Sequence, residues 1–168
     1  MKRLHIVGRK NHGKTTLLVE LVGELRRAGL RIGTIKHTSH VHELDKPGSD
    51  SCRHRLAGAD PAAVVSGRAI AVHLPCEGGD YLRQLAPMFA GCDLVLIEGH
   101  LDGEGHKIEV WRAQMGDDCL ASQRRDIAAV VTDDPAPDGV PVLPRSNLEP
   151  LVDYVLGFVG HQRQEVPS

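Results

Sequence analysis

In the first part of the chain, two short apolar runs lie on either side of a segment whose apolar residues have helical spacing. The runs at residues 3–8 and 31–38 are short and apolar, which is typical of strands. Between them the apolar positions follow the 3.6-residue period of a helix over residues 14–28: Leu17, Leu18, Leu21, Val22 and Leu25. Two arginines precede Gly29, where cations suit the helix dipole and a glycine can end the helix. The pattern predicts strand, helix, strand.

The second half repeats this alternation. Residues 92–100 hold an unbroken apolar run, Leu94 to Ile97, which suits a strand at the centre of a parallel sheet. Further strands are predicted within 106–113, 126–134 and 140–144. The last helix is expected over 147–159, with Asn147 as its N-cap and Pro150 in its first turn.

The segment between these halves is more polar. Residues 39–54 contain the turn signal Lys46-Pro47-Gly48 and predict an exposed loop. Two short apolar runs, 62–67 and 69–74, are consistent with a hairpin that turns at Gly67-Arg68. Residues 81–91 have a helical pattern that Pro87 would kink or break, and the tail over 160–168 is expected to fray.

Composition narrows the class of protein. With 168 residues, 41% of them hydrophobic and 25% charged, the chain predicts one domain, residues 1–168, with an ordinary core. Strand–helix alternation then favours a three-layer α/β fold with a mostly parallel sheet. A net charge of −2 gives no case for binding nucleic acid or an anionic membrane. The four cysteines form no CxxC pair, and no apolar run is long enough to span a bilayer, so we expect a cytoplasmic protein.

One loop carries a strong chemical signal. Residues 8–15, GRKNHGKT, match the Walker A pattern GxxxxGK[ST] between a predicted strand and a predicted helix. The glycines allow backbone N–H groups to point at phosphates, and the helix adds its positive end. The residues expected to contact a nucleotide are Gly8, Lys10, Asn11, His12, Gly13, Lys14, Thr15 and Thr16.

Two of these residues have defined chemical roles in such loops. Lys14 would reach the β- and γ-phosphates, and the Thr15 hydroxyl would ligate Mg²⁺. A second ligand is expected where the strongest strand ends, at Glu98, because P-loop proteins place an acidic residue there. The sequence thus predicts a site for Mg²⁺ and a nucleoside triphosphate.

Several stretches together resemble one family. The segments IVGRKNHGKTTLL, IGTIKHTSH, DKPGSDSCRHRLAGA and LVLIEGH occur in the order and spacing of the MobB family of GTP-binding proteins. The resemblance implies a homodimer that binds Mg-GTP, hydrolyses it weakly and assists a MobA-type guanylyltransferase in joining GMP to molybdopterin. Molybdopterin itself, or other molybdoenzyme-maturation proteins, would be further ligands or partners.

The resemblance also assigns residues. Lys14, Thr15 and Glu98 carry over as nucleotide and Mg²⁺ residues, and Lys36, His37, Asp45 and Asp50 as groups facing the phosphates or a pterin-side pocket. Asp45 is a candidate metal ligand, and Lys14, Asp50 and Glu98 are candidates for promoting hydrolysis. Asp45 and Asp50 also fit an ordinary exposed turn. His12 departs from the family, where Ser or Gly is commoner.

Three points stay open at this level. Asp133 could pair with guanine or simply stabilise a turn, because the full Asn-Lys-x-Asp signature is missing. The histidines 37, 40, 42 and 54 would suit nickel or zinc if they converged, as in a nickel metallochaperone, and otherwise are solvated or near the phosphates. An ATP-dependent small-molecule kinase or ligase on the same fold is the remaining alternative.

Overall fold

The computed structural model describes residues 2–38, 43–76 and 80–161. Contacts group the chain into two compact units, one formed by Met1–Ser39 with Phe89–Ser168 and the other by His40–Met88. No helix among the described residues is both long and apolar enough to cross a bilayer.

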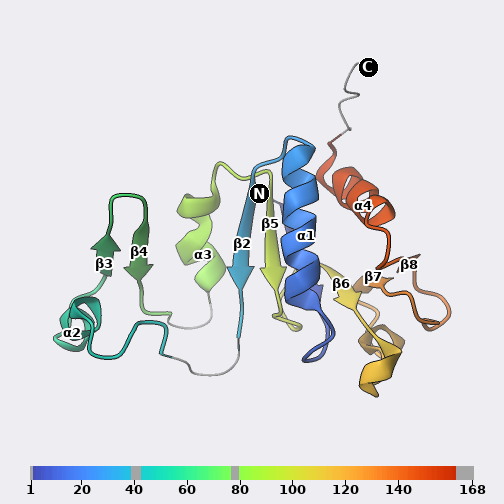
Figure 1. Ribbon diagram of the computed structural model, residues 1–168, viewed down its shortest axis with the longest axis horizontal. Coiled ribbons are helices and arrows are strands. Elements are labelled where there is room, and N and C mark those ends of the chain that lie inside the picture. Colours follow the sequence, from blue (N-terminus) through green and yellow to red (C-terminus); the bar gives the residue numbers. More distant parts are fainter. Residues whose placement is uncertain (1, 39–42, 77–79, 162–168) are drawn as a thin grey trace. The chain divides into compact units, whose positions relative to one another are not determined.

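The larger unit is built on a six-stranded sheet in which every neighbouring pair is parallel (Figure 1). In their order across the sheet, the strands are β2 (Ile32–Lys36), β5 (Leu94–Glu98), β1 (Lys2–Val7), β6 (His106–Val110), β7 (Ile127–Val131) and β8 (Val142–Leu143). This arrangement confirms the predicted α/β class with a parallel sheet flanked by helices. The carboxyl ends of all six strands share one edge, where ligands of such sheets bind.

Two helices pack together on this sheet. They are α1 (Lys14–Arg27) and α4 (Glu149–Val159), which contact each other and lie side by side in Figure 1. The fully buried leucines of α1 predicted from the helical period join one apolar cluster with β1, β5, β6, β7 and α4. All five residues of β5 are buried, which explains its continuous apolar run.

The ends of these helices follow from their sequences. Gly29, at φ 93°, follows α1, and its N–H and that of Leu30 donate to the carbonyls of Arg26 and Leu25, at 3.0 and 3.1 Å. This is the Schellman arrangement expected of a terminal glycine. At the start of α4 the helix begins after Leu148, one residue later than predicted. The Asn147 side chain nevertheless accepts the Glu149 N–H at 3.0 Å. Pro150, the next residue, has no N–H to donate, so few donors are left in this turn.

The smaller unit contains α2 (Asp50–Leu56), the antiparallel pair β3 (Ala62–Val65) and β4 (Ile70–His73), and α3 (Tyr81–Leu85). The predicted hairpin is confirmed, closed by the Ser66 N–H on the Ala69 carbonyl at 2.8 Å.

One expectation for this part of the chain was wrong in detail, and another is confirmed. The predicted loop 39–54 becomes helical from Asp50, because the Ser49 hydroxyl caps the helix by accepting the Cys52 N–H at 3.2 Å. The break expected at Pro87 is confirmed: α3 ends at Leu85, and a 3₁₀ turn, Ala86–Phe89, follows around this proline, which has no N–H to donate.

Candidate nucleotide-binding site

The loop between β1 and α1 has the backbone of a phosphate cradle. Gly8, Asn11 and Gly13 all have positive φ angles, 138°, 68° and 96°. Gly13 is the N-cap of α1, and no side chain caps the helix there. The first N–H groups of α1 are therefore open to an external acceptor, and the helix has no acidic residue in its first turn to compete with an anion.

Lys14 is folded back over this loop. Its Nζ donates to the Arg9 carbonyl at 2.6 Å. Burial lowers the pKa of Lys14, and nearby Lys36 lowers it further, while Glu98 acts in the opposite direction. A phosphate would give this ammonium group a charged acceptor in place of a neutral carbonyl, which makes a stronger hydrogen bond.

Glu98 lies at the end of β5, between the ends of β1 and β2. The parallel register pairs it with Ile6 on one side and Lys36 on the other. One carboxylate oxygen, Oε1, accepts both the Thr15 hydroxyl at 2.7 Å and the Lys36 ammonium at 2.6 Å. The sheet therefore brings together three of the predicted site residues from three separate strands or helices.

Charge and hydrogen bonding keep Glu98 ionised despite its burial. Burial alone raises its pKa, but the hydrogen bonds from Lys36 and Thr15, with the charges of Lys36 and Lys14, outweigh it and lower the pKa. An ionised carboxylate beside a hydroxyl is the hard oxygen donor set that Mg²⁺ prefers. Thr15 and Glu98 therefore fit a Mg²⁺ ion, which would compete with Lys36 for the carboxylate.

The charge of Glu98 can be tested separately from its shape. We expect Glu98→Gln to reduce the gain in GTP affinity that Mg²⁺ provides by about tenfold, because a neutral amide attracts the cation less strongly. Calorimetric titration of GTP with and without Mg²⁺ measures this gain. Glu24→Gln, near the far end of α1, is the control; an equal Mg²⁺ effect in both variants would contradict the assignment.

The structure explains the unusual His12. Its ring is fully buried and turned towards the segment after β6. Nδ1 accepts the Arg112 N–H at 3.0 Å, so Nε2 carries the proton and donates to the Asp117 carboxylate at 3.2 Å. Asp117 is held in turn by its own carbonyl, which accepts the Trp111 indole N–H at 2.9 Å. His12 therefore fastens the phosphate loop to residues 111–117.

This contact was missed at the level of sequence. Asp117 lies 105 positions from His12, and no motif signals the pairing. Asp117 also lies 3.8 Å from the Arg9 guanidinium, so two residues of the loop share one carboxylate. The remaining loop candidates, Lys10, Asn11 and Thr16, are exposed at the loop and in the first turn of α1, and their nucleotide contacts stay predictions.

His37 lies directly after β2, next to the predicted phosphate region. Its N–H donates to the Glu98 carbonyl at 2.9 Å, and its ring stacks on His100 at 4.1 Å between centroids. Burial, then the charge of His37, lowers the pKa of His100. The predicted histidine cluster includes residues 40 and 42, which lie outside the described residues. Within the part of the chain that the structure describes, no three His, Cys, Asp or Glu side chains are placed to hold a metal ion.

Asp133, the predicted guanine contact, follows β7. Its Oδ1 accepts three hydrogen bonds, from the Arg145 N–H and from the N–H and hydroxyl of Ser146, at 2.8–2.9 Å. These bonds lower the pKa of Asp133, that from the Ser146 N–H most strongly. Pairing with guanine N1 and N2 uses both carboxylate oxygens, and only Oδ2 is open. The turn-stabilising role is thus observed, and the base contact stays a prediction.

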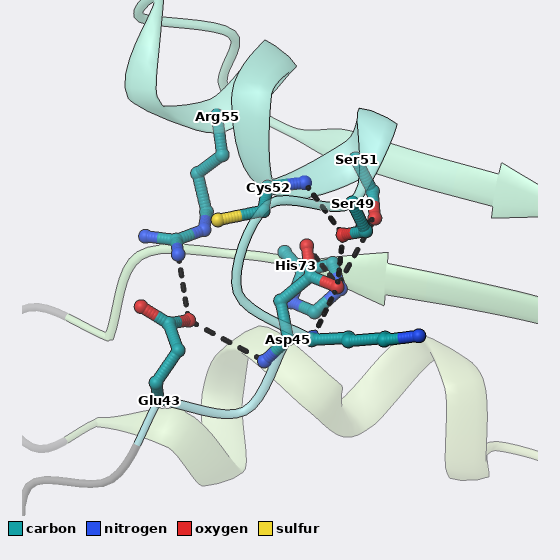
Figure 2. A network of polar contacts seen from close by, with 8 residues as sticks. Glu43, Asp45, Ser49, Ser51, Cys52, Arg55 and His73 are labelled. Atoms are coloured by element: carbon teal, nitrogen blue, oxygen red, sulfur yellow. Dashed lines mark hydrogen bonds and ion pairs between the residues drawn. The ribbon is translucent and has the colours of Figure 1, made fainter.

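Asp45 and Asp50 belong to the smaller unit, and Figure 2 shows the surroundings of Asp45. Asp45 is the centre of a polar network: its Oδ1 accepts the Lys46 N–H at 2.8 Å and the hydroxyls of Ser49 and Ser51 at 3.1 Å. Burial raises the pKa of Asp45, but these bonds and nearby His73 outweigh it and lower the pKa. Asp50 is exposed at the start of α2, where it pairs with Arg53 at 3.7 Å.

The other carboxylate oxygen of Asp45 is notable for lacking a hydrogen-bond partner. Oδ2 is buried, and Nε2 of the His73 ring lies 3.6 Å away from it. A second ion pair, Glu43 with Arg55 at 2.6 Å, lies in the same region (Figure 2). The predicted roles of Asp45 towards a metal and of Asp50 in hydrolysis stay predictions.

The strand, Walker A loop and helix, with an acidic residue ending the neighbouring strand, define an α/β protein of the P-loop class. The family model described as "MobB: Molybdopterin guanine dinucleotide synthesis protein B" matches residues 3–133. The chain therefore belongs to the MobB family, as the resemblance of its motifs indicated.

Similar proteins and structures agree with this membership. The molybdopterin-guanine dinucleotide biosynthesis adapter protein of Escherichia coli is 36% identical, over 89% of each chain. That of Haemophilus influenzae is 30% identical, over 94% of this chain and 89% of its own. Among solved structures, a molybdopterin-guanine biosynthesis protein B has a TM-score of 0.72 at 25% identity, and a MobB homolog from Bacillus stearothermophilus has 0.69 at 27%. Both alignments cover 95% of this chain and 99% of the other.

Proposed function

We propose that this protein is a GTP-binding adapter of molybdopterin-guanine dinucleotide biosynthesis, with weak Mg²⁺-dependent GTPase activity. It would act beside a MobA-type guanylyltransferase that attaches GMP to molybdopterin. The observation that carries the nucleotide part is the geometry around Glu98, where Thr15 and Lys36 meet one carboxylate oxygen beside an uncapped helix N-terminus. The pathway rests on the family and on the names of its relatives.

The chemistry of the site supports binding more strongly than rapid hydrolysis. Lys14, Thr15 and Glu98 would hold the triphosphate and Mg²⁺, which stabilises charge on the phosphates. Rapid hydrolysis also needs a group that orients the attacking water. Asp50, the candidate for that task, is exposed and paired with Arg53 in the smaller unit. These features fit a slow GTPase that acts on a partner while its nucleotide is bound.

Nucleotide titration tests the proposal directly. We expect GTP to bind more tightly than ATP, with an affinity that rises when Mg²⁺ is added, and hydrolysis slower than about one turnover per second, the low end of typical enzymes. A preference for ATP would favour the kinase or ligase alternative. Absence of binding to either nucleotide would contradict the proposal.

The smaller unit gives the expected homodimer a surface. The hairpin β3–β4 exposes several apolar side chains, with exposed fractions of 42–73%: Val64, Val65, Ile70 and Val72. A two-stranded sheet is only marginally stable in water by itself, and its edge strands offer unpaired backbone groups to another chain. We propose that two copies of this hairpin cover each other in the dimer.

A charge placed on this hairpin should separate the copies. We expect Ile70→Glu to shift a dimer to monomers at micromolar concentration, because dimerisation would bury the introduced carboxylate without a partner. Light scattering after size-exclusion chromatography measures the mass. Arg68→Glu, at the hairpin turn, is the control and should remain dimeric. A dimer of unchanged stability in Ile70→Glu would place the interface elsewhere.

A further inference from the structure

Arg112 lies against the phosphate loop, although no motif includes it. A Cβ atom built on Gly13 would approach the Arg112 guanidinium to 2.9 Å at one terminal nitrogen and 3.3 Å at its central carbon. Gly13 is the N-cap of α1, so this guanidinium lies at the positive end of the helix. A Cβ at position 13 would displace this guanidinium from the loop.

The charge of this guanidinium is not balanced locally. Among residues 2–38, 43–76 and 80–161, no hydrogen bond or ion pair to the Arg112 side chain is formed. The carboxylates that contact the loop and the start of α1 have other partners: Asp117 contacts His12 and Arg9, and Glu98 contacts Thr15 and Lys36. Asp134 accepts the N–H of Ala113 at 2.9 Å. A cation placed at a helix N-terminus with no counter-ion is unfavourable unless an anion binds there.

The backbone of Arg112 is held in place from the loop itself. Its N–H donates to Nδ1 of the buried His12 at 3.0 Å. Two residues earlier, at the end of β6, the Val110 carbonyl oxygen lies only 2.5 Å from where a Cβ on Gly8 would be. Two contacts therefore fix the segment after β6 against both ends of the loop, and the Arg112 side chain starts from a rigid position.

We propose that Arg112 is a phosphate-binding residue of this site, contacting the bound nucleotide through its guanidinium, and that His12 positions it. The inference rests on the proposed nucleotide binding and adds a cation that the Walker A motif does not contain. Arginine suits this task because its planar fork can donate two parallel hydrogen bonds to phosphate oxygens. The ligand class is a nucleoside di- or triphosphate, recognised here through its phosphates and not through its base.

Binding measurements on the full chain test Arg112. We expect Arg112→Ala to weaken GTP binding about 10- to 100-fold, the range for losing hydrogen bonds to a charged group, and Arg112→Lys to recover part of the loss. Arg31→Ala removes the same charge at the amino end of β2, the opposite edge of the sheet, and should match the wild type. Equal GTP affinity in Arg112→Ala and Arg31→Ala would overturn the proposal.

A ligand without a base separates phosphate contact from base contact. Inorganic tripolyphosphate should displace a fluorescent GTP analogue from the wild type, and Arg112→Ala should weaken this competition by a similar factor. Weaker GTP binding with unchanged tripolyphosphate competition would place Arg112 at the base or ribose, against the proposal. Failure of the wild type to bind GTP or GDP would instead overturn the proposed function and this inference together.

The positioning role of His12 has its own readout. An asparagine amide oxygen can take the place of Nδ1 and accept the Arg112 N–H, whereas alanine cannot. We expect His12→Asn to bind GTP more tightly than His12→Ala by about tenfold, the value of one hydrogen bond. Thermal unfolding shows whether each variant is folded. If His12→Ala does not fold, GTP affinity of His12→Asn more than tenfold below the wild type would contradict the role of Nδ1.

Discussion

Replacing Lys14 with alanine is expected to weaken Mg-GTP binding by at least about 100-fold, roughly 2.7 kcal/mol. The ammonium group now donates to the neutral Arg9 carbonyl at 2.6 Å, and it would exchange this acceptor for phosphate oxygens. Its loss removes charge-assisted hydrogen bonds to the phosphates, which are about twice as strong as those between neutral groups. Calorimetric titration with GTP measures the change.

The fold should not depend on this lysine. Its side chain is not a member of the buried apolar cluster, so the unfolding temperature of Lys14→Ala should stay within a few degrees of the wild type. Arg26→Ala, in the last turn of the same helix, is the matched control, because it removes one cation far from the loop. GTP affinity unchanged in Lys14→Ala would refute the assignment of the loop as a phosphate site.

Replacing Gly8 with alanine is expected to cost about 3 kcal/mol of folding free energy and to abolish nucleotide binding. The new Cβ would lie 2.5 Å from the Val110 carbonyl oxygen, and a φ of 138° is a conformation that side chains rarely adopt. Neither partner can move easily, because β1 and β6 are hydrogen-bonded neighbours in the sheet. Urea unfolding gives the free energy, and titration gives the affinity.

A second glycine separates the collision from backbone strain. Gly29, after the far end of α1, also has a positive φ, 93°, but a Cβ there would meet nothing within 4 Å. Gly29→Ala should therefore cost only the strain, about 1–2 kcal/mol, and leave GTP binding unchanged. If Gly8→Ala is no less stable than Gly29→Ala, the close approach of Val110 does not restrict position 8.

Local signals were sufficient for the larger unit. Its strands and helices follow from apolar periodicity, and the Walker A loop follows from eight adjacent residues whose backbone requirements are local. Glu98 was also found, because a strand apolar on both faces predicts its own burial and its end lies at the ligand-binding edge. The smaller unit was harder: Ser49, read as part of a loop, caps a short helix.

The tertiary structure decided the contacts between residues distant in sequence. The role of His12 follows from the position of its ring between the Arg112 N–H and Asp117. The turn-stabilising role of Asp133 follows from the hydrogen bonds that its Oδ1 accepts from Arg145 and Ser146. Spacing along a chain has no information about such pairs, because they form only when separate strand ends meet at one edge of the sheet. The sequence by itself determined the elements, the loop and the family resemblance. Only the folded chain decided which charges around the loop are paired, and it placed the Arg112 guanidinium, which forms no ion pair with the described residues, against Gly13.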